Sequence, residues 1–221
     1  MIEGAIFDMD GVLVDNAGYH IRAWIQMGRE LGTELDEVQV RGVFGQRNTE
    51  MIAALLGKTL PPSQVEQYGD RKEEIYRDLI KPELKAVPGL YDLMDDLKSE
   101  GFATAVATSG PLENANLVMD GLKLRPWFDA IVTGAEVSRG KPHPDIFLAA
   151  ARRVNLGPRQ CVVFEDSVSG IEAARRAGSP CVALATTHSA RELQGLSALR
   201  IISDFRAMRA ADLRSLAAKV P

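Results

Sequence analysis

Hydrophobic and polar positions divide the chain into three stretches with different periodicities. A short apolar run of strand length begins at Gly4 and ends at Asp8. From residue 16 to about residue 85, apolar positions recur at helical spacing, and this stretch predicts no strand. From residue 86 onward, short apolar runs alternate with helical segments. Such alternation predicts right-handed crossovers and a parallel sheet with helices on both faces.

This order of elements predicts an α/β fold, with a Rossmann-like parallel sheet core and an inserted α-helical cap domain. The predicted strands cover residues 4–7, 102–107, 130–133, 161–164, 181–184 and 199–202. The predicted helices cover residues 16–31, 51–56, 62–80 (as one or two helices), 90–101, 112–119, 145–154, 170–177 and 212–218. Asn16 is expected to cap the first of these helices, and Gly57 to end the second. Residues 1–15 and 86–221 would form the core, and residues 16–85 the cap.

Composition describes an ordinary globular protein and excludes few classes. The chain has 221 residues and a net charge of -4, so nothing indicates nucleic acid or an anionic membrane as a partner. No apolar run approaches the ~18 residues of a spanning helix, and the early first strand leaves no room for a signal peptide. We therefore expect a cytoplasmic protein, monomeric by default, in which Cys161 and Cys181 are buried, reduced thiols.

Chemically active side chains follow the predicted strands. Asp8 and Asp10 leave the first strand two residues apart, and Gly11 lets the chain turn away above them. A polar turn would also explain these three residues taken alone. The later strands are followed by hydroxyl groups, a lysine and two further acids: Thr108, Ser109, Lys141, Glu165 and Asp166.

The carboxyl ends of parallel strands meet at one edge of the sheet, which is where ligands bind in such folds. Four acids and one lysine on that edge would repel strongly, and a bound Mg²⁺ would offset their charge. Thr108 and Ser109 precede a helix, whose N-terminus favours an anion. A metal end beside an anion end is the layout that phosphoryl transfer requires.

The four motifs, taken in this order, resemble those of the haloacid dehalogenase superfamily over nearly the whole chain. The motifs are Asp8-Met9-Asp10-Gly11-Val12, Thr108-Ser109, Lys141-Pro142 and Glu165-Asp166-Ser167. Within the superfamily, the chain is most similar to the β-phosphoglucomutase-like subgroup, which carries a helical cap. That likeness rests on His20 with the following Arg22-Ala23-Trp24, on Arg47, on Lys72, and on the run from Gly140 to Phe147.

The resemblance implies a role for each of these residues. Asp8 would be the nucleophile that forms an aspartyl phosphate, and Asp10 the general acid and base. Asp8, Asp166 and the backbone carbonyl of Asp10 would bind Mg²⁺, with Glu165 as a direct or indirect ligand. Thr108 and Lys141 would hold the phosphoryl oxygens. The substrate would further contact Ser109 and three cap residues: His20, Arg47 and Lys72.

Three functions remain open on this evidence. The first is a Mg²⁺-dependent phosphatase of a small, sugar-like phosphate ester. The second is a β-phosphoglucomutase, which needs a second phosphate site and is favoured by Arg47, Lys72 and His20. The run Thr108-Ser109-Gly110-Pro111-Leu112 departs from the mutase pattern and favours the phosphatase. The third is a binding protein on the same fold, against which the complete set of acids argues.

Overall fold

The protein, in a computed structural model that describes residues 1–57 and 60–216, is built on a six-stranded parallel sheet. The strands are β1 (Gly4–Phe7), β2 (Ala103–Thr108), β3 (Ala130–Thr133), β4 (Cys161–Glu165), β5 (Cys181–Leu184) and β6 (Arg200–Ile202). Their order is β3-β2-β1-β4-β5-β6, which places β1 in the interior of the sheet. All six predicted strands are confirmed, and so is the α/β fold class.

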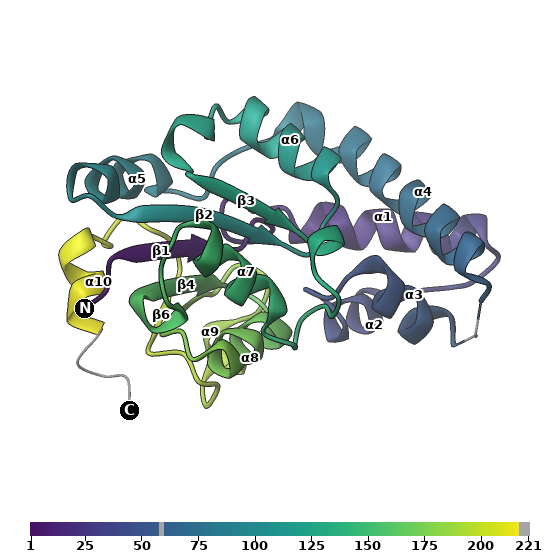
Figure 1. Cartoon of the computed structure of the whole chain (residues 1–221). Coiled ribbons are helices and arrows are strands. Elements are labelled where there is room, and N and C mark those ends of the chain that lie inside the picture. The colour runs from purple at the N-terminus through teal and green to yellow at the C-terminus, as the bar shows by residue number, and fades with distance from the viewer. Residues whose placement is uncertain (58–59, 217–221) are drawn as a thin grey trace.

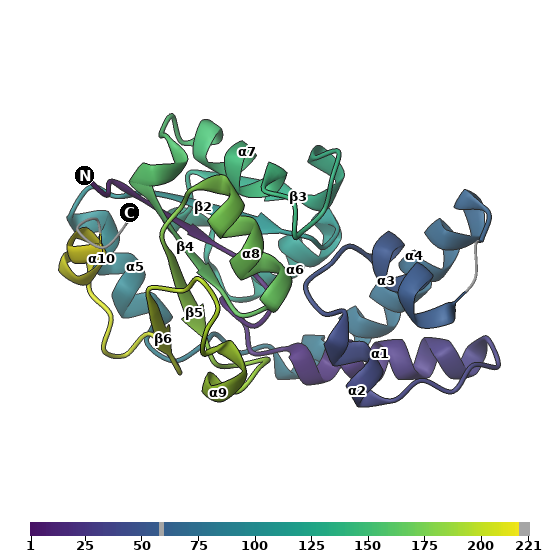
Figure 2. The same ribbon diagram turned by 90° about the horizontal axis from the view of Figure 1, so that it is seen from below.

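Helices cover both faces of this sheet, as Figures 1 and 2 show. One face packs against α5 (Leu90–Ser99), α6 (Leu112–Gly121) and α10 (Ala210–Leu216). The other face packs against α7 (Asp145–Arg153), α8 (Val168–Ala177) and the short α9 (Ala190–Leu193). Alternate residues of β1 pack against the helices of opposite faces: Phe7 lies in the hydrophobic core on the α5 side and Ile6 in the core on the α7 side. Both faces of the central strands are therefore buried, as in other parallel sheets.

Four helices follow β1 before the chain reaches α5 and then the second strand of the sheet. They are α1 (Ala17–Glu30), α2 (Glu37–Gly42), α3 (Asn48–Leu56) and α4 (Pro62–Ile80). Their apolar faces share a hydrophobic core of their own, in which Trp24, Ile52 and Tyr76 are fully buried. In Figure 1 this helical unit lies beyond the end of the sheet toward which β1 points. It is thus placed above the carboxyl ends of the strands.

The helices differ from the expected ones mainly where they are short. The pattern did not predict α2 and α9, which have six and four residues and so show too little periodicity. Gly57 ends α3 in the left-handed conformation, as expected. Asn16 occupies the N-cap position of α1, as expected, but its side chain makes no capping hydrogen bond. The last two residues of the expected closing helix lie outside the described part of the chain.

The order in which the chain adds strands to the sheet changes direction beside β1, although all the strands are parallel. Beyond β1 the strands run β2 then β3 on one side, and β4, β5, β6 on the other. Asp8 follows β1 directly, and Glu165 ends β4, which pairs with it. In open α/β sheets such a reversal opens a crevice outside the carboxyl ends of the strands, and ligands bind there. The two principal acidic motifs therefore lie side by side at this position.

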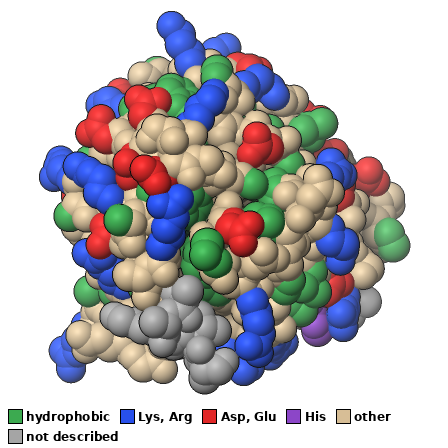
Figure 3. Space-filling model, turned by 60° about the vertical axis from the view of Figure 1, so that its left-hand side comes forward, with side chains coloured by type: hydrophobic (Ala, Val, Ile, Leu, Met, Phe, Trp, Pro, Cys, Tyr) green, Lys and Arg blue, Asp and Glu red, His purple; other side chains and the backbone are tan. Residues whose placement is uncertain are grey.

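Further expectations concern the two cysteines, membrane-spanning helices and the charge of the surface. Cys161 and Cys181 begin β4 and β5 as buried, free thiols, as expected. Among the described residues, no helix combines the length and the apolar character needed to cross a membrane. On the face that Figure 3 shows, basic and acidic side chains are interspersed with hydrophobic ones.

Candidate active site

Four predicted residues meet in a buried cluster at the carboxyl edge of the sheet. Asp8 follows β1, Glu165 ends β4, Asp166 comes next, and Lys141 arrives on the loop between β3 and α7. Carboxylate oxygens of the three acids lie within 4.8 Å of one another. The most exposed of the four residues is Asp8, at 6%. Segments more than a hundred residues apart are thus brought to one point by the parallel topology.

Lys141 bridges two of these acids. Its Nζ lies 2.6 Å from Asp8 Oδ1 and 2.6 Å from Glu165 Oε1. Burial alone would lower the pKa of Lys141, but the negative charges of Asp8 and Glu165 outweigh it and raise that pKa. Burial, with the charges of Glu165 and Asp10, raises the pKa of Asp8 to about 7 although Lys141 lowers it. The ammonium therefore compensates only part of the acidic charge.

Glu165 is held by the start of α8. Its Oε2 accepts hydrogen bonds from the backbone N–H groups of Asp166 and Ser167, at 2.8 and 2.7 Å, and from the Ser167 hydroxyl at 2.9 Å. Ser167 also caps the helix by accepting from Gly170 N–H. A Cβ on Gly170 would lie 1.7 Å from Glu165 Oε1, so this helix position must be glycine for the carboxylate to fit. With Oε1 on Lys141, both oxygens of Glu165 are already engaged.

Asp166 is the acid without a partner. Its Oδ2 is buried and makes no hydrogen bond among the described residues. Burial first, then the charges of Glu165 and Asp8, raises the pKa of Asp166 well above its ordinary value. Gly11, in the left-handed conformation at φ 76°, lets this carboxylate approach, since a Cβ there would lie 1.9 Å from Oδ2. The site thus offers an unused oxygen ligand.

These donors fit a divalent cation. Three carboxylates face one ammonium, which leaves two negative charges without a counterion. Buried charges of one sign are stable only when paired or when they coordinate a metal. A hard cation such as Mg²⁺ prefers carboxylate, carbonyl and water oxygens, and this cluster supplies the first of these.

Asp10 belongs to a second network, directed toward the helical unit. Its Oδ1 accepts from Asn16 Nδ2 at 2.5 Å and lies 3.2 Å from His20 Nε2. Asn16 also donates to the Tyr76 hydroxyl at 2.6 Å and accepts from Gly11 N–H. Burial raises the pKa of Asp10, but the charge of His20 and the hydrogen bonds from His20 and Asn16 outweigh it and lower that pKa. Asn16 therefore acts as a connector here instead of a helix cap.

The network continues through His20 into α4. Lys72 Nζ lies 2.7 Å from His20 Nδ1 and 2.9 Å from Glu73 Oε1. The other ring nitrogen of His20, Nε2, faces Asp10. Glu73 also accepts from Asn114 of α6, at 2.6 Å, which links α4 to the sheet domain. His20 is further fixed by stacking on Tyr76, with ring centroids 3.7 Å apart.

The predicted hydroxyl residues lie at the end of β2. Thr108 is fully buried, and its Oγ1 accepts from Gly110 N–H at 3.0 Å. The Ser109 hydroxyl donates to the backbone carbonyl of Gly45, at 3.0 Å, so it joins the sheet domain to the helical unit. Ser109 lines the pocket described next, whereas Thr108 is not among its lining residues.

Among the described residues, Arg47 makes no hydrogen bond or ion pair with another predicted site residue. It does not line the pocket. Its guanidinium pairs with Glu50 on α3 and reaches the backbone carbonyl of Val137 at 3.4 Å. Its role in phosphate binding therefore stays a prediction.

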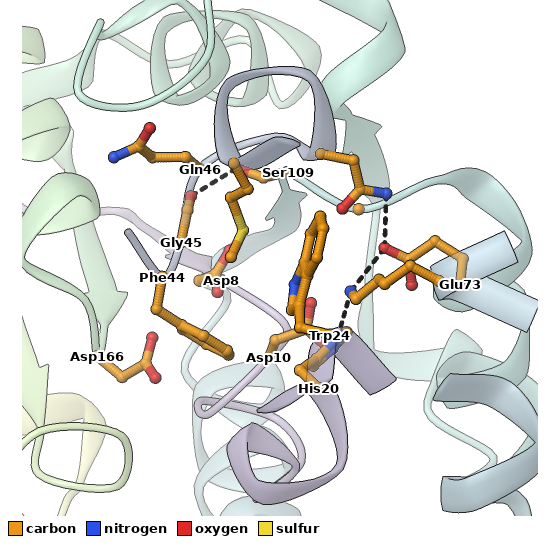
Figure 4. Close-up of a pocket in the computed structure, with 14 residues that line it drawn as sticks. Asp8, Asp10, His20, Trp24, Phe44, Gly45, Gln46, Glu73, Ser109 and Asp166 are labelled. Carbon is orange, nitrogen blue, oxygen red and sulfur yellow. Dashed lines mark hydrogen bonds and ion pairs between the residues drawn. The ribbon is translucent and has the colours of Figure 1, made fainter. Parts of the chain in front are cut away.

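A pocket separates the sheet edge from the helical unit (Figure 4). The sheet domain contributes Asp8, Asp10, Ser109, Gly110 and Asp166 to its lining, and the helical unit contributes His20, Trp24, Phe44, Gly45, Gln46, Asn48, Met51, Lys72 and Glu73. Asp8 and Asp10 thus face polar and aromatic side chains of the helical unit. An ester whose phosphoryl group reaches Asp8 would place its leaving group among these residues.

Sequence reasoning did not identify Asn16, Trp24 or Glu73 as site residues. Asn16 carried a helix-cap signal, and Trp24 occupied an apolar position of a helical pattern. Glu73 follows Lys72 in a charged stretch that looked solvent-exposed, yet it is only 4% exposed. No local signal could have found these roles, because each depends on contacts between distant segments.

The fold is of the α/β class, and its site gathers carboxylates and a lysine at the edge of the sheet. The chain belongs to the haloacid dehalogenase-like hydrolase family, whose model matches residues 2–178. It is 34% identical over 177 residues to the "Phosphorylated carbohydrates phosphatase" of Thermotoga maritima, covering 80% of this chain and 82% of that protein. It is 32% identical over 185 residues to the "Beta-phosphoglucomutase" of Bacillus subtilis, covering 80% of each.

Structural similarity extends over the whole chain. A haloacid dehalogenase hydrolase of family IA, variant 3, from Entamoeba histolytica superposes with a TM-score of 0.89 at 29% identity, covering 98% of this chain and 100% of that one. The expected family and the expectation of an enzyme are therefore confirmed.

Proposed function

We propose that this protein is a Mg²⁺-dependent phosphatase that hydrolyses small phosphorylated carbohydrates through an aspartyl phosphate on Asp8. The observation that carries the proposal is the buried cluster of three acids and one lysine beside the pocket that Asp8 and Asp166 line. The similarity to the Thermotoga maritima phosphatase supports the substrate class.

Asp8 is oriented as a nucleophile by Lys141. The ammonium holds Oδ1, and the hydrogen bonds that Asp8 makes among the described residues leave Oδ2 free. Oδ2 can then attack phosphorus in line with the departing ester oxygen, which forms the aspartyl phosphate. Lys141, with the Thr108 hydroxyl, would hold the oxygens of the transferring group and stabilise its charge.

Asp10 is arranged to move the proton. Asn16 and His20 both occupy Oδ1, so Oδ2 is the oxygen that can protonate the leaving alcohol and later deprotonate water. The lowered pKa makes Asp10 a carboxylate in the free protein at neutral pH. A bound phosphoryl group brings negative charge close to Asp10 and raises its pKa, which favours the protonated form needed for the first step.

The metal would be held by the acids on the sheet edge. Asp8, the unpartnered Oδ2 of Asp166 and the backbone carbonyl of Asp10 are the proposed ligands. Glu165 acts on them indirectly, because Lys141 and the start of α8 occupy both its oxygens. When bound, Mg²⁺ supplies positive charge that lets the phosphoryl oxygens approach these acids.

We infer that residues 16–85 work as a cap over residues 1–15 and 86–221. Contacts between the two parts surround the pocket, including Ser109 to Gly45, Asn114 to Glu73, and Arg41 to the carbonyl of Thr187 at 2.6 Å. Opening of these contacts would admit substrate, and closure would exclude bulk water from Asp8. His20, Lys72 and Ser109 then contact the leaving group.

A second candidate is a β-phosphoglucomutase, favoured by the similarity to the Bacillus subtilis enzyme. A mutase must hold a phosphate at each end of a bisphosphate intermediate. The cationic groups available for the second phosphate are already occupied, since Lys72 pairs with Glu73 and Arg47 with Glu50. Arg47 also does not line the pocket. These placements favour hydrolysis.

The proposal is tested by measuring phosphate release from glucose 6-phosphate and p-nitrophenyl phosphate with and without Mg²⁺. We expect Mg²⁺-dependent release that Asp8→Asn abolishes while circular dichroism shows an intact fold. A coupled assay with β-glucose 1-phosphate and a trace of bisphosphate tests the mutase. Rapid formation of glucose 6-phosphate with little free phosphate would overturn the phosphatase.

We also propose that the protein is a monomer in the cytoplasm. The absence of a coiled-coil pattern in the sequence supports a monomer, and the buried, free thiols of Cys161 and Cys181 are typical of a cytosolic protein. Size-exclusion chromatography with light scattering measures the oligomeric state.

A further inference from the structure

The indole N–H of Trp24 is a buried donor without an acceptor. Trp24 lies on α1, is fully buried and lines the pocket. Its Nε1 makes no hydrogen bond among the described residues. The other tryptophan, Trp127, donates its Nε1–H to Asp95 at 2.8 Å. Buried tryptophan N–H groups usually find a partner, so Trp24 is the exception that needs an explanation.

Neighbouring side chains of the protein do not supply the missing acceptor. Lys72 lies beside the indole, with its Nζ 5.2 Å from the ring centroid, but an ammonium can only donate. The indole stands among the lining side chains in Figure 4, with its nitrogen on the side of Asp8 and Asp10. An N–H group can only donate, so the partner that completes it must bring an oxygen into the pocket.

The charges around Trp24 favour a neutral oxygen over a second phosphate. Lys72 is neutralised by Glu73, which is itself buried and also lines the pocket. Arg47 pairs with Glu50 outside the lining. A second phosphate here would face Glu73 without an unpaired cation, whereas a hydroxyl group carries no charge to offset.

We propose that Trp24 Nε1 donates a hydrogen bond to a hydroxyl oxygen of the substrate's leaving group, and so selects monophosphates of polyhydroxylated molecules. This inference rests on the proposed phosphatase activity and names the chemistry that its pocket recognises. A substrate without that hydroxyl would leave the indole donor buried and unpaired, which penalises its binding in both the ground state and the transition state.

The test combines two substrates with two proteins. Glucitol 6-phosphate and n-hexyl phosphate are six-carbon monophosphates that differ in their hydroxyl groups. Trp24→Phe keeps an aromatic ring and removes the N–H. For the wild type, kcat/KM should favour glucitol 6-phosphate, and Trp24→Phe should reduce that preference by about tenfold. A preference that stays within twofold of the wild-type value would overturn the proposal.

A measurement on the unsubstituted indole removes the dependence on how Trp24→Phe folds. The chain has two tryptophans, so an amide-correlation NMR spectrum shows two indole N–H signals. In Asp8→Asn protein with Mg²⁺, glucitol 6-phosphate should shift the Trp24 signal and leave that of Trp127 in place. A Trp24 signal that does not move at saturation would contradict the contact.

These two readouts separate the inference from the activity on which it rests. Failure of the wild type to release phosphate from either ester would overturn the phosphatase. The NMR titration would then still decide whether a polyol phosphate reaches Trp24.

Discussion

Gly170→Ala should destabilise the protein although it replaces glycine by the best helix former in a helix. Gly170 lies in α8, where alanine would normally add about 0.5–1 kcal/mol to the free energy of unfolding. Here the added Cβ would lie 1.7 Å from Glu165 Oε1 and 1.9 Å from its Cδ. The carboxylate must therefore leave its place.

The cost follows from what Glu165 contacts. It is fully buried, and its displacement breaks the contact with Lys141 and three hydrogen bonds from Asp166 and Ser167. Separating a buried ion pair costs about 3–5 kcal/mol. After the gain in helix propensity, we expect a net loss of about 2–4 kcal/mol. Phosphatase activity should fall as well, because Lys141 loses one of the two carboxylates that position it.

Urea unfolding followed by circular dichroism measures this loss. Gly18→Ala is the matched control, since Gly18 lies in α1 with nothing within 4 Å of its added Cβ. That variant should be as stable as the wild type or slightly more so. In a Glu165→Ala background, Gly170→Ala should cost much less, because the clash is gone. A Gly170→Ala protein as stable as the wild type would refute the reasoning.

Three further predictions concern the metal, the buried acid and the thiols. Gly11→Ala should weaken Mg²⁺ binding at least tenfold in a calorimetric titration, because its Cβ would lie 1.9 Å from Asp166 Oδ2; unchanged affinity would remove Asp166 as a ligand. Burial raises the pKa of Glu73, but the charges of Lys72 and His20, with hydrogen bonds from Lys72 and Asn114, outweigh burial and lower that pKa. The ionised Glu73 therefore stabilises the fold above its unfolded-state pKa of about 4.3, and this contribution is lost as the pH falls through its folded-state pKa. Glu73→Gln should therefore destabilise the protein at pH 7, and the gap to the wild type in urea unfolding should narrow toward acid pH; a gap independent of pH would contradict this. Burial, then the charge of Glu3, raises the pKa of Cys161 to about 12, and Cys181 is buried. A thiol reagent at pH 8 should therefore label neither cysteine before the protein unfolds. Rapid labelling of the native protein would count against these placements.

The sheet and the acidic edge could be predicted because their signals are local. Each strand is a short apolar run bounded by turns, and parallel order follows from its alternation with helices. The same order places Asp8, Lys141 and Asp166 at one edge before any contact is known. The six strands accordingly match the expected ranges to within one residue at each end.

The pocket could not be predicted because its parts come from segments that the pattern does not connect. Asn16 looks like a helix cap, but its side-chain amide donates a hydrogen bond to the hydroxyl of Tyr76, sixty residues away. Trp24 looks like an ordinary core residue, and its free N–H appears only when every neighbour is placed. Arg47 shows the opposite case, since a residue of the matching type pairs with Glu50 and does not line the pocket.

The central claim is that Asp8 accepts the phosphoryl group, and acid quenching tests it most directly. The wild type is mixed with Mg²⁺ and radiolabelled glucitol 6-phosphate, quenched in acid within one turnover, and digested. The account predicts label on the peptide that contains Asp8, which hydroxylamine releases and Asp8→Asn abolishes. Phosphate release in a rapid, Mg²⁺-dependent turnover with label that never appears on that peptide would contradict it.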